Sequence, residues 1–519
     1  MTRFKRWTAF LLAAATIALA GCSGQPAASG SAPAGSSSAG VTSAAAPKET
    51  TVKIALGSEP DSLDPMLSAA TDTSSVMDNV FEGLLGFNQK GEFIPAIAES
   101  YTLSDDGLTY TFKLKKGIRF HDGKDCTAKD VKYTYDKLAG LSGAKALSST
   151  LSAELAKVEC PDDYTVVFTL KNKDAGFLSK AIFSIVEKDY EKNATQPIGT
   201  GPYKFVQYVK GQKVVLEKND GYTTIADRKP KVDRVEFSIM TDENAKLMAL
   251  KSGDLDIAGI NSSDIQALGS DFDIIQGPQN MVQIFALNNK VKPLDNLKVR
   301  QAICYAIDKD EIISTVANGA GTKVESFLSP SMAVYYNDKI NAYHPDAAKA
   351  KELLKEAGYA DGFTLTVKVP SNYQFHVDTA QVIKNQLAKV GITLNIQLIE
   401  WAQWLDGVYT KRDYQTTIIG HSGKLDPQDF LNRFSTTYAK NYFNFSNKDY
   451  DALVAKGALT ADQTERAQIY KDAQQMLVDQ AATVFIQDPH LVFAVSKKVK
   501  GLAIYPVTFF NLGELSVEP

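Results

Sequence analysis

A strand–helix–strand pattern constrains the fold of this chain more than any other feature. Apolar and polar residues alternate from Thr364 to Val369 and again from Ile392 to Leu398, the two-residue period of half-buried strands. Between them, apolar side chains around 380–390 recur at helical spacing and stop before Gly391. Strands joined in this way pair in parallel with a right-handed crossover. The pattern therefore predicts an α/β fold.

The same α/β character appears earlier in the chain. Leu108 to Leu114 and Thr165 to Leu170 alternate in the same way and predict two more strands. Thr127 to Asp130 has the form of a capping box, which predicts that a helix begins there. With 519 residues, 44% of them hydrophobic, the chain is globular in composition and too long for one core. We therefore expect about three domains.

The charge balance argues against one class of partner. The chain has 56 Lys and Arg residues against 60 Asp and Glu residues, a net charge of −4. No excess of positive charge is available to neutralise a phosphate backbone. We therefore expect no nucleic-acid partner.

The N-terminal residues predict an exported protein that is held at a membrane. Three basic residues precede an apolar run from Trp7 to Ala20, which is shorter than a membrane-spanning helix and typical of a signal-peptide core. The run ends in Leu-Ala-Gly-Cys22, which resembles a bacterial lipobox. The resemblance implies a lipoprotein signal peptide over 1–21 and lipid attachment at Cys22. The alternative is an ordinary signal peptide that happens to precede a Cys.

A flexible linker is expected over 22–50. From Ser23 to Thr50, 22 of 28 positions are Ser, Ala, Gly or Pro, a composition that does not bury enough apolar surface to fold. Together with the lipid, this segment predicts a folded body tethered close to a membrane.

The remaining cysteines, Cys126, Cys160 and Cys304, are odd in number. A Cys126–Cys160 disulfide is one interpretation, but small buried hydrophobic residues are favoured.

Motifs for catalysis are incomplete in this sequence. Gly420-His421-Ser422-Gly423 has Lys424 where a nucleophile elbow requires glycine. Gly199-Thr200-Gly201 begins like a dinucleotide fingerprint, but its third glycine position holds Lys204. The five His residues show no zinc-binding spacing. We expect a protein without enzyme activity or cofactor, with an envelope hydrolase as a distant alternative.

Several short sequence motifs are distributed along the chain from about Val52 to about Leu512. The most specific block, Ser104–Gly117, reads SDDGLTYTFKLKKG. The other blocks are Gly57–Pro65, Phe81–Leu85, Pro95–Ser100, Phe120–Gly123 with Thr127–Val131, Pro197–Tyr203, Val299–Ala302 with Tyr305–Asp308, and Leu353–Tyr359. In this order they resemble the extracytoplasmic solute-binding proteins of ABC importers, in the oligopeptide/dipeptide/nickel-binding class (family 5). Because most of these residues form turns, caps and packing contacts, they identify the fold better than the ligand.

The resemblance implies a fold of the periplasmic-binding-protein-like kind (type II, cluster C). Such an α/β fold has two lobes, mixed sheets, an extra subdomain and a ligand cleft between the lobes. By analogy, lobe I comprises 51–71, 196–285 and 487–519, the extra subdomain 72–195, and lobe II 286–486. The crossings near Gln283–Ala286 and Phe485–Asp488 are expected to form the hinge. A ligand that contacts both lobes then stabilises the closed form.

Two segments match positions that line the pocket in this family, Ser58-Glu59 and Gly420 to Pro427. Peptide-binding relatives have a Trp after that glycine and, shortly afterwards, an Asp that holds the ligand's α-ammonium group. This chain has His421 and then Gly423 or Lys424 at these places. The change removes a charge-assisted hydrogen bond worth about 1.5–3 kcal/mol. Asp426 is an alternative anchor, although its position before Pro favours a turn.

Aromatic residues complete the set of candidates. Trp404 and Trp401 follow a strand. We expect their indoles either to stack against a ligand or to pack in the contact between the lobes. Tyr373 follows another strand end, where ligands gather in open α/β sheets, or else lies in a surface turn. The candidate ligand-binding residues are therefore Ser58, Glu59, Tyr373, Trp404, Gly420, His421, Ser422 and Asp426.

The resemblance implies a lipoprotein that captures peptides and delivers them to an importer. Its partners would be a small solute, most often a peptide, and the permease with its ATPase subunits. A nickel or metal–chelator complex contacted by His421 is the alternative, followed by another solute such as an oligosaccharide. We expect a monomer outside the cytoplasm, anchored through Cys22 to the outer face of the cell membrane, which is the periplasmic side where the host has an outer membrane.

Overall fold

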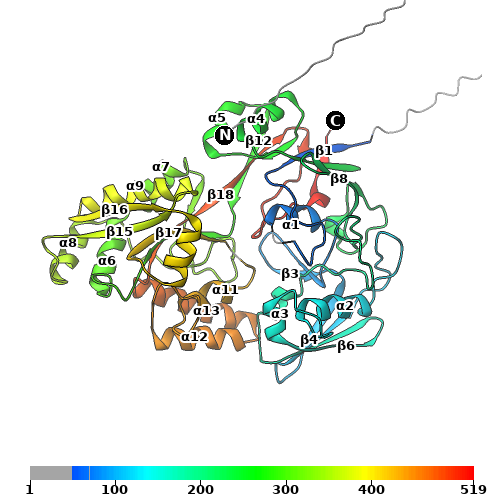
Figure 1. Cartoon of the computed structure of the whole chain (residues 1–519), viewed down its shortest axis with the longest axis horizontal. Coiled ribbons are helices and arrows are strands. Elements are labelled where there is room, and N and C mark those ends of the chain that lie inside the picture. Colours follow the sequence, from blue (N-terminus) through cyan, green and yellow to red (C-terminus); the bar gives the residue numbers. More distant parts are fainter. Residues whose placement is uncertain (1–48, 69, 423, 519) are drawn as a thin grey trace, which may run out of the picture. The chain divides into compact units, whose positions relative to one another are not determined.

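The computed structural model describes residues 49–68, 70–422 and 424–518 (Figure 1). The predicted signal peptide, the lipid attachment at Cys22 and the linker up to residue 48 lie outside the described residues. Within the described part, no helix is long and apolar enough to cross a membrane.

Most strands belong to one mixed sheet of 12 strands, in the order β16-β15-β17-β13-β18-β11-β1-β10-β9-β8, with β12 and β14 also paired to β18. The strands are β1 (Thr51–Leu56), β8 (Tyr203–Val209), β9 (Lys213–Lys218), β10 (Arg234–Ile239), β11 (Ile257–Gly259), β12 (Phe272–Pro278), β13 (Met281–Leu287), β14 (Gly321–Lys323), β15 (Phe363–Pro370), β16 (Ile392–Ile399), β17 (Thr416–Ser422) and β18 (Val484–Ser496).

Strand β18 joins two regions of this sheet. Its residues 484–489 pair with β13 and β14, and its residues 490–496 pair with β11 and β12. We call β1 and β8–β12 the first sheet region, and β13–β17 the second sheet region. One continuous strand is therefore hydrogen-bonded into both.

The predicted strand–helix–strand unit is confirmed. β15 and β16 pair in parallel along their whole length, and α9 (Gln374–Ala388) connects them. The helix begins earlier than the apolar spacing indicated. Its first turn carries the exposed Gln374 and the half-buried Phe375. Such a turn gives no apolar periodicity to detect.

Helices cover both faces of the second sheet region. On one face lie α6 (Leu297–Ala306), α7 (Lys309–Val316), α8 (Ala347–Glu356) and α9; on the other lie α10 (Trp401–Gln403), the π-helix η4 (Trp404–Thr410), α11 (Gln428–Leu431), η5 (Asn432–Phe434), α12 (Lys448–Leu459) and α13 (Gln463–Asp479). Alternate residues of β13 enter the two cores, with Ile284 in one and Phe285 in the other. This is the two-residue period of a strand that is buried on both faces.

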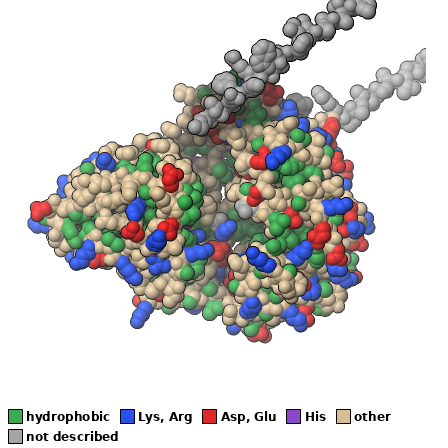
Figure 2. Space-filling view, viewed as in Figure 1, with side chains coloured by type: hydrophobic (Ala, Val, Ile, Leu, Met, Phe, Trp, Pro, Cys, Tyr) green, Lys and Arg blue, Asp and Glu red, His purple; other side chains and the backbone are tan. Residues whose placement is uncertain are grey.

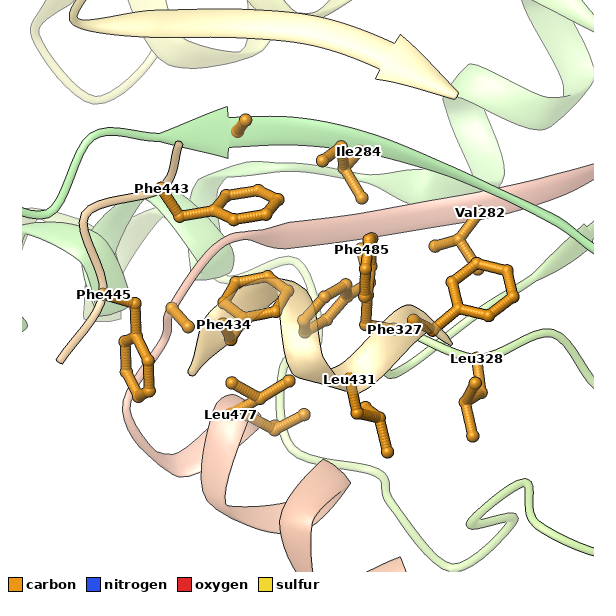
Figure 3. Packing of buried hydrophobic residues seen from close by; sticks show 14 of the residues in the cluster. Val282, Ile284, Phe327, Leu328, Leu431, Phe434, Phe443, Phe445, Leu477 and Phe485 are labelled. Carbon is orange, nitrogen blue, oxygen red and sulfur yellow. The ribbon is translucent and has the colours of Figure 1, made fainter. Parts of the chain in front are cut away.

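The core on the α13 side is rich in phenylalanine. Figure 3 shows Phe327, Phe434, Phe443 and Phe485 packed together beside β13. The rings of Phe434 and Phe443 are stacked with centroids 4.0 Å apart, and the ring of Phe327 meets that of Phe434 edge-on at 5.0 Å. Such edge-on and offset contacts add to the stabilisation from burial alone.

A separate antiparallel sheet lies within residues 72–195. Its order is β4 (Ala98–Leu103), β5 (Thr109–Leu114), β7 (Thr165–Leu170), β6 (Leu155–Asp162), and α2 (Ala128–Ala139) and α3 (Ser149–Glu154) pack on it. The capping box predicted at Thr127 is confirmed, with Asp130 as its second member.

The three described cysteines are free; Cys126 and Cys304 are buried, as expected for small hydrophobic residues, whereas Cys160 is partly exposed.

The remaining elements are short. They are β2 (Leu85–Phe87) with β3 (Phe93–Pro95), β19 (Val499–Lys500) with β20 (Ser516–Val517), the helices α1 (Thr71–Met77), α4 (Glu243–Ser252) and α5 (Ile265–Leu268), and the 3-10 turns η1 (Phe177–Lys180), η2 (Ala226–Arg228), η3 (Ser262–Asp264) and η6 (Leu512–Glu514). Figure 2 shows acidic and basic side chains interspersed on the visible face, as expected from the small net charge.

Candidate ligand-binding site

Three strands of the second sheet region end at the same edge. β15 pairs in parallel with both β16 and β17, so their carboxyl ends lie together. Tyr373 follows β15, Trp401 follows β16, and Gly420 to Ser422 form the end of β17. Ligands of open α/β sheets bind at this edge. The fold therefore gathers most of the predicted site residues at one place.

The end of β17 has an unpaired side. β17 pairs with β13 from Thr416 to Ser422, but with β15 only at Thr416 and Thr417. Beyond Thr417, the residues of β17 have no strand partner among the described residues on the side where β15 pairs. Of these residues, Gly420 and Ser422 are not buried, and an exposed strand edge can pair with an extended chain.

An aromatic wall stands at the same edge; we use this name for Tyr373, Trp401, Trp404 and Tyr409. Successive ring centroids lie 5.5, 5.1 and 5.8 Å apart, and the two indoles are stacked within 5° of parallel. Trp404 is buried, and its Nε1 donates to Thr417 Oγ1 at 2.9 Å. Tyr373 is 40% exposed. The surface open to a ligand is therefore Tyr373 with the half-buried Trp401, and Trp404 supports it from the interior.

His421 points into the phenylalanine-rich core. Its Nε2 lies 2.7 Å from the Tyr442 hydroxyl, and its ring meets that of Phe327 at 5.3 Å. Burial holds the pKa of His421 well below its usual value, so the imidazole is neutral at physiological pH. Because one ring nitrogen is engaged and the ring is packed, the structure offers little room for a ligand at this side chain.

Gly420 packs closely against the side chains of Met281 and His376. A Cβ at this position would lie 2.6 Å from Met281 Sδ and 3.6 Å from His376 Cε1. His376 is buried at the start of α9, and its Nδ1 accepts a hydrogen bond from the Gln283 side-chain amide at 3.0 Å. Burial lowers the pKa of His376 to about 4. Sequence reasoning missed His376, because a lone histidine carries no spacing signal.

Asp426 forms a buried ion pair with Arg466 of α13. Its two carboxylate oxygens accept from Arg466 Nη1 and Nη2 at 2.8 and 3.0 Å, and both side chains are at most 4% exposed. One oxygen also accepts the Gln428 backbone N–H at 2.8 Å, which is the turn contact expected before Pro. These contacts satisfy the carboxylate without a ligand.

Ser58 and Glu59 follow β1 in the first sheet region. The Ser58 hydroxyl donates to Asp72 Oδ2 at 2.7 Å. The Glu59 carboxylate accepts from the Tyr208 hydroxyl and, at 3.0 and 3.1 Å, from the Gly211 N–H. These hydrogen bonds, from Tyr208 and then from Gly211, lower the pKa of Glu59. The structure thus places these two residues apart from the group at the end of β17, on the other sheet region.

Metal ligands are not clustered in the described part of the chain. Across residues 49–518, apart from 69 and 423, no group of three or more His, Cys, Asp or Glu side chains is arranged to hold a metal ion.

Comparison with known proteins agrees with this architecture. The family model "Bacterial extracellular solute-binding proteins, family 5 Middle" matches residues 92–442. The dipeptide-binding protein of Escherichia coli (strain K12) is 31% identical over an alignment of 531 positions, which covers 92% of this chain and 96% of that protein. The glutathione-binding protein GsiB of Pectobacterium atrosepticum is 32% identical over 479 residues, covering 88% and 92% of the two chains.

A solved structure shows the same likeness. The ABC transporter-associated periplasmic binding protein DppA from Helicobacter pylori, in complex with the peptide STSA, superposes with a TM-score of 0.71 at 28% identity, over 90% of this chain and 98% of that one. The chain belongs to the bacterial extracellular solute-binding proteins, family 5. Members of this family are solute-binding proteins and not enzymes.

Proposed function

We propose that this protein binds peptides and delivers them to an ABC importer. The observation that carries the proposal is the near full-length likeness to proteins named for dipeptide, glutathione and peptide binding. The geometry supports it, because the unpaired side of β17 beyond Thr417 offers main-chain donors and acceptors to an extended ligand. Pairing of this kind gives affinity without selecting a side-chain sequence. The aromatic wall beside it would contact apolar side chains of the ligand.

The first experiment identifies the natural ligand. The chain without residues 1–22 is purified under native conditions, and whatever co-purifies is identified by mass spectrometry. Calorimetric titrations with Ala-Ala, tetra-alanine, reduced glutathione and a nickel–histidine complex then follow. A ladder of short peptides, or binding of the first two probes, supports the proposal. A single mass with a nickel isotope pattern, together with binding of only the nickel complex, would replace it with metal-complex import.

Glutathione is a second candidate ligand. The relative named as glutathione-binding is as similar to this chain as the one named as dipeptide-binding, at 32% and 31% identity. Reduced glutathione carries two carboxylates and a γ-linked amide, so it would use the same main-chain edge with a different charge pattern. Binding of glutathione at least tenfold tighter than that of either alanine peptide would favour this candidate.

The proposed mechanism is closure of two lobes about a hinge. Lobe I (51–71, 196–285, 487–519) carries the extra subdomain (72–195), and lobe II is 286–486. The hinge proposed near Phe485–Asp488 is supported by the pairing of β18, which changes from β14 to β12 just after this segment, between Pro489 and His490. Small-angle scattering with and without the identified ligand tests closure; an unchanged radius of gyration would contradict it.

Lipid anchoring at Cys22 completes the proposal. The lipobox-like sequence before Cys22 and the Ser/Ala/Gly/Pro-rich segment after it support a tethered monomer that works beside its permease and ATPase subunits. Metabolic labelling with a palmitate analogue should mark the wild-type chain and not a Cys22→Ser variant. Equal labelling of both would contradict anchoring at this residue.

A further inference from the structure

An aromatic socket lies outside the proposed lobe II; we use this name for Phe87, Tyr505 and Phe509. The three rings meet edge-on with centroids 5.2–6.0 Å apart. The Arg228 guanidinium lies 4.7 Å from the centre of the Phe509 ring, and it donates to the Phe87 carbonyl oxygen at 2.9 Å. These contacts fix the rings relative to one another, so the socket is a preformed apolar surface.

Leu425 fills this socket. It is 6% exposed and forms one buried cluster with the three socket residues. Every other residue of the cluster, including its partly buried neighbours, lies between 87 and 182 or between 503 and 509. Leu425 is therefore the single member that comes from the proposed lobe II, and its burial depends on how the two lobes meet.

The backbone around Leu425 is held on the lobe II side. Asp426, the next residue, is fixed by its buried two-point contact with Arg466 of α13. On the other side, the Lys424 carbonyl oxygen accepts from Asn280 Nδ2 of the proposed lobe I at 3.2 Å, which is a further contact between the lobes. Leu425 is thus connected to lobe II through Asp426, and it lies three residues after Ser422 at the end of β17.

A second contact beside Leu425 reinforces this junction. The Ala175 N–H donates to the Ala458 carbonyl oxygen at the end of α12 at 2.8 Å. Gly176 lies directly against Asp426, because a Cβ at Gly176 would be 3.0 Å from Asp426 Oδ2. The extra subdomain therefore touches lobe II at the same short segment that Leu425 anchors.

We propose that Leu425 is a positioning residue for ligand binding: docked in the aromatic socket, it limits how far the lobes spread when no ligand is bound, and it holds the end of β17 in place for the ligand. This inference rests on the proposed function. Loss of the docked side chain lets the lobes spread, so that a bound ligand loses contacts on one side and leaves faster.

The test compares Leu425→Ala with Leu425→Met and with Leu147→Ala in the chain without residues 1–22. Met keeps an apolar side chain of similar volume in the socket. Leu147, which is 47% exposed, is the matched control for loss of the same atoms elsewhere. Titrations use whichever of Ala-Ala, tetra-alanine and reduced glutathione the wild type binds, and stopped flow gives the rate constants.

Lobe spacing is measured independently of ligand. Spin labels are attached at Lys145→Cys in the extra subdomain and Lys448→Cys in lobe II, both at exposed positions, in a Cys160→Ser background. Pulsed dipolar spectroscopy then gives the distribution of distances between the labels. It is recorded for the wild-type, Leu425→Ala, Leu425→Met and Leu147→Ala chains without ligand.

We expect Leu425→Ala to broaden the distance distribution and to raise the dissociation constant at least tenfold, mostly through faster dissociation. Leu425→Met and Leu147→Ala should stay within threefold of wild type. A distribution unchanged in Leu425→Ala overturns the inference, as does a broadened one with unchanged affinity. If the wild type binds none of the probes, the proposed function fails, and the distance distribution alone decides whether Leu425 limits how far the lobes spread.

Discussion

The ion pair between Asp426 and Arg466 should be a major determinant of stability. Both side chains are at most 4% exposed, and two hydrogen bonds of 2.8 and 3.0 Å join them. In Asp426→Ala, the guanidinium keeps its contacts to the Gly457 carbonyl oxygen at 2.9 Å and to the Tyr470 hydroxyl at 3.3 Å, but it loses its counter-charge. Breaking a buried pair by removing one partner costs about 3–5 kcal/mol. We expect a loss of this size in the free energy of unfolding.

Urea unfolding followed by tryptophan fluorescence measures this loss. The double variant Asp426→Leu/Arg466→Met removes both charges, and it should recover more than half of the loss because no uncompensated charge remains buried. Glu352→Ala is the control, since the Lys349–Glu352 pair is 43% and 56% exposed and such pairs contribute about 0–1 kcal/mol. Salt at 1 M should change the control pair's contribution and leave the buried pair's unchanged.

One result would refute this reasoning. If Asp426→Ala unfolds within 1 kcal/mol of wild type and yet abolishes peptide binding, the carboxylate serves the ligand rather than the fold. Asp426 would then be the anchor that the sequence left open, and Arg466 would be its orienting partner.

Three further predictions concern the same region. His421→Ala should lower the free energy of unfolding by about 1–3 kcal/mol through the unpaired Tyr442 hydroxyl and leave peptide affinity within threefold in titrations; loss of binding would instead favour the metal complex. Gly420→Ala should weaken peptide binding, and adding Met281→Ala, which removes the clashing sulfur, should restore it; no recovery would contradict the packing argument. Burial raises the pKa of Asp488 to about 6, so the folded state binds this proton more tightly than the unfolded state, and the contribution of Asp488 to stability falls as pH rises from about 4 to 6. Urea titrations across this range should show that wild type loses more stability than Asp488→Asn; equal losses would contradict the assignment.

Local features of the sequence predicted much of the fold. The capping box at Thr127 and the strand–helix–strand unit around α9 are visible in sequence because each depends on residues a few positions apart. The parallel pairing of β15 with β17, which brings the strand ends before Tyr373 and at Gly420 to one edge, was not predicted from the sequence.

Long-range partners could not be predicted in the same way. Arg466 lies 40 residues from Asp426, and Tyr442 lies 21 residues from His421. No periodic pattern links such pairs, so the partners that satisfy the two candidate side chains inside the fold could not be identified from sequence. The sequence could not show that Trp404 is buried while Trp401 is partly exposed, since both indoles follow the same strand.

Strand β18 has a consequence for how the protein is made. It is the last long strand of the chain, from Val484 to Ser496, and it lies between β13 and β11 in the interior of the sheet. Until it arrives, β13 and β11 both have an open edge, and neither sheet region is complete. During synthesis, the two sheet regions therefore cannot complete their pairing before the C-terminal strand has been made. A chain that stops short of β18 should be a substrate for envelope proteases rather than a smaller binding protein.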